Sequence, residues 1–278
     1  MAHSFIMCYE KEVDAFKAYL RASEGNTTLL VDTYDTHQGV KNAIRASQET
    51  GIKLQGIRID SGDLAYWSKE ARKLLDAANM QHTKIVVSND LDEYLIENLI
   101  MVQHAPIDIF AAGTKLVTAY DNPALGGVFK TKEYQKEPKI KIAEGKTTIP
   151  GATNIIRIIK DGKYEGDIIT KSDTDLVQNG VLTRDIKSYK INSTTKENIC
   201  FKKGTFAYTL LTPVMENGNL IWPYSDLTLK QIRNNTINNL NKLDNSYKRL
   251  ANPHIYGVGL EQNLFNLQQQ MITKYQER

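Results

Sequence analysis

The chain has 278 residues, of which 41% are apolar and 24% are charged, and its formal net charge is +3. This weak charge argues against a nucleic-acid-binding protein, whose cationic residues usually form a dense patch. Two cysteines are too few for a disulfide framework, and no apolar run approaches the ~20 residues that cross a bilayer. The first residues also lack the features of a secretory signal. We therefore expect a cytoplasmic protein that binds neither nucleic acid nor membranes.

Strand and helix patterns alternate over the first 122 residues. Short β-branched, apolar runs that fit buried parallel strands are separated by helices of amphipathic spacing. Four such strands end in polar or glycine residues, namely Asp32, Asp60, Asn89 and Gly113. Their spacing of roughly 24 to 30 residues is that of the βα units of a barrel. Since the carboxyl ends of parallel strands meet at one edge of a sheet, we expect a functional site there.

The ends of the intervening helices are also marked. Thr36 is placed to cap the helix after the first strand, and Gly51 to end it. Asp63 is placed to cap the helix after the second strand. These signals strengthen the prediction of successive βα units.

The sequence changes character after about residue 125. Asp161-Gly162 and Asn217-Gly218 are hairpin signals within β-rich stretches. The polar stretch 172–198 is interpreted as a solvated loop or weak strands. Ser225 is placed to cap a helix that runs to about Leu243, and a last helix follows. We therefore predict two domains, residues 1–125 and residues 126–278.

The predicted fold class is α/β, and its parallel part corresponds to only half of a barrel, because a complete eight-unit barrel takes about 250 residues. Half a barrel leaves strand edges unpaired, which is a hazard for aggregation. We therefore expect either additional sequence or a partner chain to complete the sheet. A β-rich segment and C-terminal helices follow the partial barrel.

The densest polar constellation is GIRIDSGDL, residues 56–64. Arg58 and Asp60 are two residues apart on a strand and therefore share a face. One interpretation is an ion-paired strand end followed by a helix cap. The other is an arginine that binds a planar anion beside a carboxylate that meets hydroxyls or a cation.

Three other strand ends carry polar groups. FAAGTKLVT, residues 110–118, contains a small-residue turn that can direct backbone amides at a phosphate. SNDLDEY, residues 88–94, and DTYDTH, residues 32–37, are taken singly as helix caps with acidic neighbours. Their convergence at one edge of the sheet favours a functional interpretation.

Several of these stretches together resemble a known family. AHSF, TLLVDTYDT, GIRIDSGDL, SNDLDEY, GTKLVTAYDNPALGGVFK and YKRLANPHIYGVGL look like motifs of nicotinate phosphoribosyltransferase, in that family's order and across essentially the whole chain. The resemblance implies a partial (β/α) barrel of the type II phosphoribosyltransferase kind. It also implies the conversion of nicotinate and phosphoribosyl pyrophosphate to nicotinate mononucleotide and pyrophosphate in NAD salvage, with ATP as co-substrate and Mg²⁺ as cofactor. The magnesium ligands are not identified.

The resemblance also assigns roles to individual residues. His3 matches a histidine that ATP phosphorylates, Arg58 the arginine that meets the pyridine carboxylate, and Asp60 the acid near the ribose hydroxyls. Two further pairs are assigned to the phosphate groups of the substrate. Gly113 and Thr114 match the family's phosphate-binding turn, and Asn89 and Asp90, at a neighbouring strand end, are assigned to the ribose phosphate. Neutral imidazole is a competent phosphoryl acceptor. By position alone, His3 would be a solvated terminal residue.

The resemblance includes one large departure, because the family has a substantial region before AHSF that this sequence does not contain. That region supplies an aromatic ring that stacks on the pyridine and residues that reach a second subunit's site. We therefore expect a homodimer in the full-length family and little or no activity from this chain alone. The alternatives are a non-catalytic half-protein that complements a separate N-terminal half, and a phosphate-binding α/β protein with other chemistry.

Overall fold

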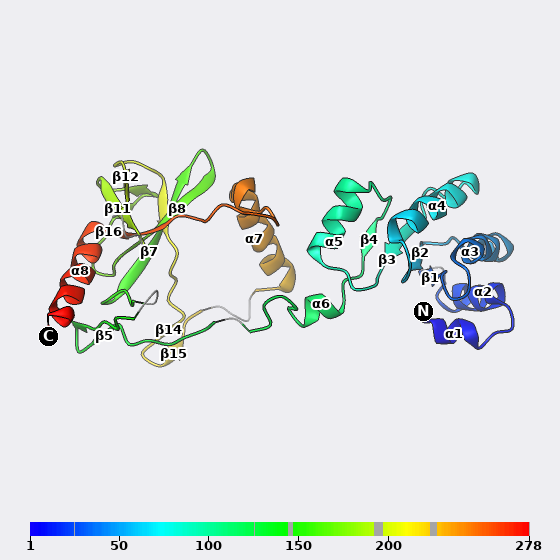
Figure 1. The fold of residues 1–278 in the computed structure, drawn as a ribbon, viewed down its shortest axis with the longest axis horizontal. Coiled ribbons are helices and arrows are strands. Elements are labelled where there is room, and N and C mark those ends of the chain that lie inside the picture. The colour runs from blue at the N-terminus through cyan, green and yellow to red at the C-terminus, as the bar shows by residue number, and fades with distance from the viewer. Residues whose placement is uncertain (25, 125, 144–146, 192–196, 223–226, 278) are drawn as a thin grey trace. The chain divides into compact units, whose positions relative to one another are not determined.

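The computed structural model describes residues 1–24, 26–124, 126–143, 147–191, 197–222 and 227–277 (Figure 1). The chain forms two compact units, Met1–Gly126 and Gly127–Arg278. Both contain helices and strands, so the fold is mixed α/β. Among the described residues, no helix is long and apolar enough to cross a membrane.

A four-stranded parallel sheet is the centre of the first unit. Its strand order follows the sequence, β1-β2-β3-β4. The strands are β1 (Thr28–Leu30), β2 (Gly56–Ile59), β3 (Lys84–Val87) and β4 (Ile109–Phe110), and every pairing is parallel. The predicted alternation of strand and helix is therefore confirmed for this region.

Helices precede, connect and follow these strands. They are α1 (His3–Met7), α2 (Glu12–Ala22), α3 (Thr36–Thr50), α4 (Leu64–Ala77), α5 (Glu93–Glu97), the π-helix η1 (Asn98–Val102) and α6 (Thr114–Val117). Phe16 and Leu20 of α2 are fully buried with Ile57 and Ile85 of the strands in one apolar cluster. Burial of such side chains stabilises by about 1.5–3 kcal/mol each, so this core holds the strand ends in place.

The helix ends are close to those predicted. Gly51 ends α3 in the left-handed conformation, with φ +67°, and the Asp63 carboxylate caps α4 by accepting from the amide of Tyr66. The predicted cap at Thr36 is wrong by one residue: Asp35 is the cap and accepts from the amide of Gln38 at 2.7 Å. An aspartate caps at least as well as a threonine.

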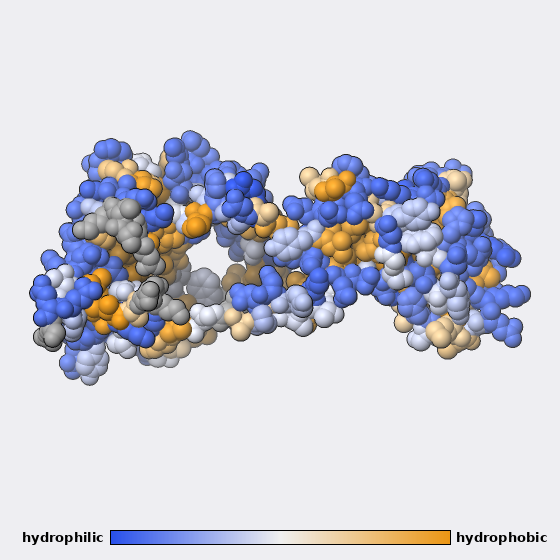
Figure 2. Space-filling model, in the orientation of Figure 1, coloured by the Kyte–Doolittle hydropathy of each residue, from blue (hydrophilic) through white to orange (hydrophobic). Residues whose placement is uncertain are grey.

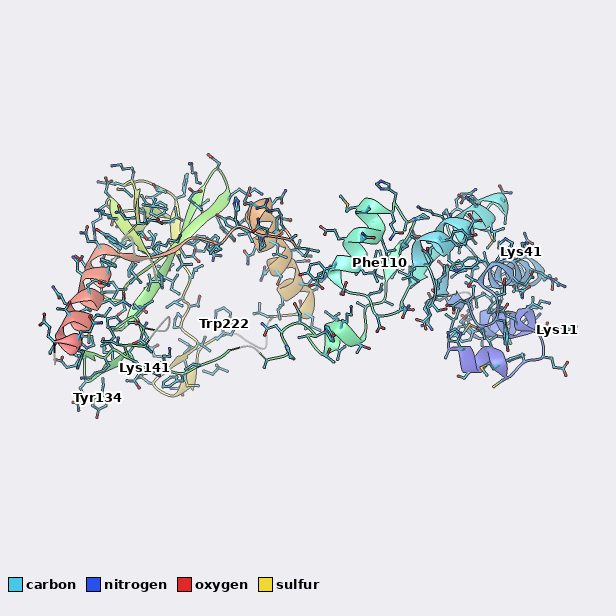
Figure 3. The ribbon with its side chains drawn as sticks, viewed as in Figure 1. Lys11, Lys41, Phe110, Tyr134, Lys141 and Trp222 are labelled. Carbon is cyan, nitrogen blue, oxygen red and sulfur yellow. The ribbon has the colours of Figure 1, made fainter. Side chains whose placement is uncertain are left out.

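The strands β1 and β4 are the outer strands of this sheet in the part of the chain that the structure describes. Ile109 of β4 is 49% exposed, and Met101 and Val102 of η1 are 68% and 67% exposed. Figure 2 shows the apolar side chains that gather over this region of the first unit, and Figure 3 labels Phe110 at the end of β4. The sheet is therefore open, with apolar side chains uncovered near its β4 edge.

The second unit contains a six-stranded sheet of order β12-β11-β16-β8-β7-β13. Its strands are β7 (Thr153–Lys160), β8 (Lys163–Lys171), β11 (Ile186–Lys190), β12 (Asn198–Phe201), β13 (Ala207–Thr209) and β16 (Val258–Glu261). All pairings are antiparallel except that of β8 with β16. The turn at Asp161 and Gly162, with φ +50° and +74°, joins β7 to β8 as the hairpin signal predicts.

Shorter elements complete this unit. They are the pairs β5 (Glu133–Tyr134) with β6 (Glu137–Pro138), β9 (Val177–Gln178) with β10 (Val181–Leu182) and β14 (Met215–Glu216) with β15 (Asn219–Leu220), and the helices α7 (Leu229–Lys242), η3 (Asn245–Tyr247) and α8 (Gln262–Gln276). Phe265 of α8 stacks on Tyr189 at 4.3 Å between ring centroids. This contact packs α8 against β11.

Two predictions for this unit concern the polar stretch 172–198 and the start of α7. The polar stretch 172–198 contains the regular strand β11 and the buried side chains Leu176, Leu182 and Ile186, which belong to the core of the sheet. Of the two interpretations, the one as strands is confirmed at β9, β10 and β11. The one as a solvated loop is wrong there, because these apolar residues anchor the polar segment to the core. The predicted cap Ser225 lies outside the described residues, and Thr228 caps α7 in a capping box with Gln231.

Candidate functional site

Polar side chains meet at the carboxyl end of the parallel sheet, where β1, β2 and β3 finish. Asp32 follows β1, Asp60 follows β2 and Ser88 follows β3. The Asp32 carboxylate accepts from the Asp60 amide at 2.7 Å and from the Ser61 hydroxyl at 2.9 Å. These bonds tie the first strand end to the turn after the second.

Asp60 receives two further neighbours. The Ser88 hydroxyl donates to Asp60 Oδ1, and His3 Nε2 lies 3.7 Å from Asp60 Oδ2. His3 Nδ1 is 3.1 Å from the hydroxyl of Thr33. The predicted proximity of these strand ends is therefore found, and His3 lies beside them at the start of α1.

Backbone packing fixes the position of this edge. A Cβ atom built on Gly39 of α3 would lie 1.9 Å from the Val31 carbonyl oxygen, so only glycine allows α3 to approach the end of β1 so closely. The Val31 amide in turn donates to the Arg58 carbonyl at 3.1 Å. The segment that carries Asp32 and Thr33 is thus held from both sides.

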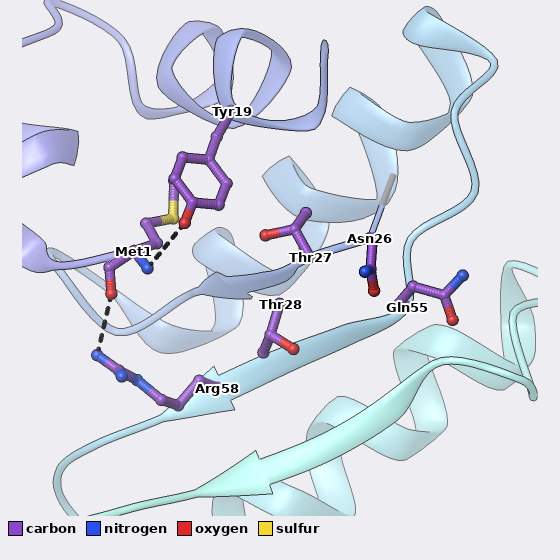
Figure 4. A pocket seen from close by; sticks show the side chains of 7 residues that line it. All are labelled: Met1, Tyr19, Asn26, Thr27, Thr28, Gln55 and Arg58. Atoms are coloured by element: carbon purple, nitrogen blue, oxygen red, sulfur yellow. Dashed lines mark hydrogen bonds between the residues drawn. The ribbon is translucent and has the colours of Figure 1, made fainter. Parts of the chain in front are cut away.

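Arg58 borders a polar pocket of about 270 Å³ in the first unit (Figure 4). The pocket is lined by Met1, Tyr19, Asn26, Thr27, Thr28, Gln55 and Arg58. The Arg58 guanidinium donates to the Met1 carbonyl at 3.3 Å, and the Met1 amino group donates to the Tyr19 hydroxyl at 3.1 Å. Arg58 Nε is buried and has no hydrogen-bond partner among the described residues. This arginine therefore retains a donor for a further acceptor.

The other predicted residues lie at the ends of β3 and β4. Asn89 and Asp90 are exposed and both have a positive φ, +92° and +44°. Asparagine and aspartate tolerate this conformation better than most residues. Gly113 and Thr114 are exposed at the start of the short helix α6. Within the described ranges, no hydrogen bond joins these four residues to the side chains of His3, Arg58 or Asp60.

An ion pair nevertheless connects these two loops. Lys115 Nζ lies 2.6 Å from Asp92 Oδ2, and Asp92 also caps α5 by accepting from the amide of Leu95 at 2.8 Å. The bond from Lys115 and the amide of Leu95 lower the pKa of the Asp92 carboxyl, and Asp92 raises the pKa of Lys115. The turn after β4 is thus fastened to the turn after β3.

Three residues of this site were given no role from the sequence, although they lie in the stretches DTYDTH and SNDLDEY. They are Asp32, Thr33 and Ser88, all of which contact the predicted residues directly. Asp32 Oδ1 is also buried without a partner in the described part of the chain. The position of Asp32 at a strand end was the available signal. The contacts of Thr33 and Ser88 follow from three-dimensional proximity, which the sequence does not contain.

The described residues include no group of three or more histidine, cysteine, aspartate or glutamate side chains that could hold a metal ion. Magnesium is often bound by only one or two carboxylates together with substrate phosphates. The pair Asp32 and Asp60 fits such a shared arrangement, and does not fit a site made by protein ligands alone.

The sequence comparisons point to nicotinate phosphoribosyltransferases. Residues 153–268 match the family described as the nicotinate phosphoribosyltransferase C-terminal domain. Nicotinate phosphoribosyltransferase of Bacillus subtilis is 37% identical over the whole chain, which covers 57% of that protein. A nicotinate phosphoribosyltransferase of Mycobacterium tuberculosis is 39% identical over 61% of the chain and 36% of its own length.

The fold is similar to that of a solved nicotinic acid phosphoribosyltransferase. The crystal structure of human nicotinic acid phosphoribosyltransferase has a TM-score of 0.67 and 23% identity, and the match covers 94% of this chain and 49% of the human chain. At this identity the likeness concerns the fold alone. The chain spans about half the length of the curated relatives it matches. Over its whole length the chain is similar in sequence to nicotinate phosphoribosyltransferases, and residues 153–268 match the C-terminal domain of that family.

Proposed function

We propose that this chain carries nicotinate-binding and ribose-binding residues of a nicotinate phosphoribosyltransferase that acts in NAD salvage. In this reaction the pyridine nitrogen of nicotinate attacks the anomeric carbon of phosphoribosyl pyrophosphate. Nicotinate mononucleotide forms and pyrophosphate leaves. The names of the relatives support the reaction, and the residues at the sheet edge support the division of roles.

The observation that carries the proposal is the environment of Arg58. A guanidinium binds a planar carboxylate through two parallel hydrogen bonds, and Arg58 has a buried Nε without a partner in the described structure. The adjoining pocket, of about 270 Å³, is slightly smaller than the ~300–1,000 Å³ of drug-sized ligand sites. This size suits a single pyridine ring better than a nucleotide. We assign the nicotinate carboxylate to Arg58.

Asp60 is assigned to the ribose. Substitution at an anomeric carbon passes through an oxocarbenium-like state, which a nearby carboxylate stabilises. The hydrogen bond from the Ser88 hydroxyl and the proximity of His3 hold the Asp60 carboxylate in place. Its backbone is fixed by Asp32. Such support is what a residue that must meet a developing positive charge requires.

The phosphate groups are assigned to the neighbouring loops. Asn89 and Asp90 are exposed at the end of β3, and Gly113 and Thr114 at the end of β4. Exposed backbone amides in such turns can bind phosphate oxygens. The ion pair of Lys115 with Asp92 keeps both loops at the same edge.

His3 is assigned as the residue that ATP phosphorylates, with ATP as co-substrate. A phosphoryl group there would add negative charge beside Asp60, which can order the adjoining loops. Magnesium is assigned to the substrate pyrophosphate, with Asp32 and Asp60 as the carboxylates that would face it. When bound, the ion would neutralise the charge of the leaving group.

We further propose that the first unit is part of a (β/α) barrel of the type II phosphoribosyltransferase kind. Its four parallel strands are half of the eight in a closed barrel. Because the described sheet is open at β1 and β4, we expect the isolated chain to have little or no activity. Closure could come from a longer form of the protein, from a homodimer partner or from a separate N-terminal half. The relatives' greater length supports the first of these.

Two assays test this function. The purified chain is first incubated with nicotinate, phosphoribosyl pyrophosphate, ATP and Mg²⁺, and nicotinate mononucleotide is measured. We expect at most a trace of product, and turnover at a rate usual for enzymes, about 1–10³ per second, would refute the need for closure. A protein with the barrel completed should form the product, and Arg58→Gln should then raise the KM for nicotinate. An unchanged KM would refute the role of Arg58.

A further inference from the structure

The His3 ring is contacted at both of its nitrogen atoms. Nε2 faces the Asp60 carboxylate at 3.7 Å, and Nδ1 faces the Thr33 hydroxyl at 3.1 Å. We infer that Thr33 is a positioning residue that orients this ring and keeps the neutral imidazole in the tautomer with its proton on Nε2. The inference rests on the proposed function only in giving His3 a chemical role.

The direction of the two contacts follows from what each group can donate. An ionised carboxylate is only an acceptor, whereas a hydroxyl both donates and accepts. A bare Nε2 would turn its lone pair towards the negative Asp60 carboxylate. A proton on Nε2 is therefore favoured, and Nδ1 becomes an acceptor. Thr33 supplies the matching O–H donor.

The backbone of Thr33 is held by its neighbours on both sides. Asp32 is bonded to the Asp60 amide and the Ser61 hydroxyl, and Asp35 caps α3. The β-branched threonine side chain also has fewer favourable rotamers than serine. A hydroxyl so fixed can set the plane of a histidine ring that lies near the chain terminus.

Thr33 and Asp60 orient the ring together, because each of them faces one of its two nitrogen atoms. Thr33 does so without bringing a charge of its own.

The test is the tautomer of His3, read from long-range ¹H–¹⁵N NMR spectra of the full chain with ¹⁵N-labelled histidine. His37, His82, His104 and His254 are internal references. We expect the Nε2–H form of His3 to dominate. In Thr33→Val, which removes the hydroxyl and keeps the shape, the tautomer ratio should fall by about 2- to 10-fold, the effect of one neutral hydrogen bond. Thr33→Ser should remain close to wild type.

Two results would overturn the inference. One is a wild-type ring that is mainly protonated on Nδ1, and the other is a Thr33→Val spectrum in which His3 is unchanged. If Thr33→Val fails to fold, Thr33→Ser and Thr33→Ala take its place, and the Nε2–H preference must weaken only in the alanine variant. These readouts need no turnover, so they stand apart from any failure of the proposed reaction. In a barrel-complete enzyme, Thr33→Val should lower kcat and leave the KM for nicotinate unchanged.

Discussion

The Asp32 carboxylate accepts a hydrogen bond from the backbone amide of Asp60 at 2.7 Å and so joins the ends of β1 and β2. The same oxygen accepts from the Ser61 hydroxyl. A side chain that replaces backbone pairing at the end of two strands sets the shape of the turn that follows them. The position of Asp60, and with it the proposed ribose contact, depends on Asp32.

Removal of this link should destabilise the first unit. Asp32→Ala leaves the Asp60 amide and the Ser61 hydroxyl without their acceptor, which typically costs about 1–3 kcal/mol when the donor is buried. Urea unfolding should therefore show a lower midpoint for Asp32→Ala than for the wild type. Asp121→Ala, at an exposed position of the same unit, is the matched control and should be near neutral. Equal midpoints for the two variants would contradict this account of Asp32.

Glu12 should make stability depend on pH. Its carboxyl is buried, and Oε1 has no partner in the described chain. Burial raises the pKa of this carboxyl, and the negative charges of Asp35 and Asp32 raise it further. The hydrogen bond from Asn42 lowers the pKa but does not cancel the rise. The folded protein thus holds this proton more tightly than the unfolded chain, so stability falls as the pH rises above the unfolded pKa of about 4.3. Glu12→Gln should remove this loss.

The measurement is the free energy of unfolding of both proteins between pH 4 and pH 8. Below the unfolded pKa the two should differ little. Above it the Gln variant should become the more stable, by about 1.4 kcal/mol for each unit by which folding raises the pKa. A difference that stays constant with pH would show that the Glu12 carboxyl is not perturbed in the fold.

The ion pair between Lys115 and Asp92 is expected to set the pKa of the aspartate. The bond from Lys115 lowers that pKa first, and the amide of Leu95 contributes next. Lys115→Met should therefore raise the Asp92 pKa towards the ordinary value, as measured by carboxyl NMR titration. Lys41→Met, in which an exposed lysine of α3 is changed, should leave it unaltered. No change in Lys115→Met would mean that the pair does not persist in solution.

Gly39→Ala tests the packing of α3 on the end of β1. The new Cβ would meet the Val31 carbonyl at 1.9 Å, a backbone atom that can move only with the strand. Such overpacking usually costs about 1–3 kcal/mol. Gly127→Ala adds a Cβ that meets nothing within 4 Å and should have little effect on the thermal midpoint. A Gly39→Ala midpoint equal to that of the control would show that α3 can shift freely.

Replacement of Arg157 tests whether a partly buried ion pair stabilises the second unit. Its guanidinium bonds both Asp167 oxygens at 2.8 Å, Tyr256 donates to the same carboxylate at 3.1 Å, and the Asp167 side chain is only 10% exposed. Arg157→Met leaves this carboxylate without its countercharge, which typically costs about 3–5 kcal/mol. The loss should appear in chemical unfolding of the chain. Lys160→Met, at an exposed position at the end of β7, serves as the comparison and should be near neutral.

The parallel sheet could be predicted because its signals are local. Apolar β-branched strands, amphipathic helices and the marked ends at Gly51 and Asp63 all agree. The sheet of the second unit was harder to predict from the sequence, because it pairs β8 with β16 and β11 with β16, which lie far apart in the chain. Leu176, Leu182 and Ile186 anchor a polar segment to that sheet, and their spacing has neither the helical nor the strand period.

Part of the candidate site could also be predicted from local sequence signals. The strand ends at Asp32 and Asp60 could be placed together from the rule that parallel strands end at one edge. The position of His3 beside Asp60 rested on resemblance, since a residue so near the first position has no pattern of its own. The contact of Thr33 with the His3 ring depends on how α1 folds back on the sheet, and only the structure gives it.

The central claim is that Arg58 recognises the carboxylate of nicotinate, and NMR titration of the Arg58 side-chain Nε–H resonance tests it most directly. We predict that nicotinate shifts this resonance in a saturable manner and that nicotinamide, which has no carboxylate, shifts it far less. Arg45→Gln, a change on the surface of α3, should bind nicotinate like the wild type, and Arg58→Gln should not. Equal responses to the two ligands, or unchanged nicotinate binding by Arg58→Gln, would contradict the claim.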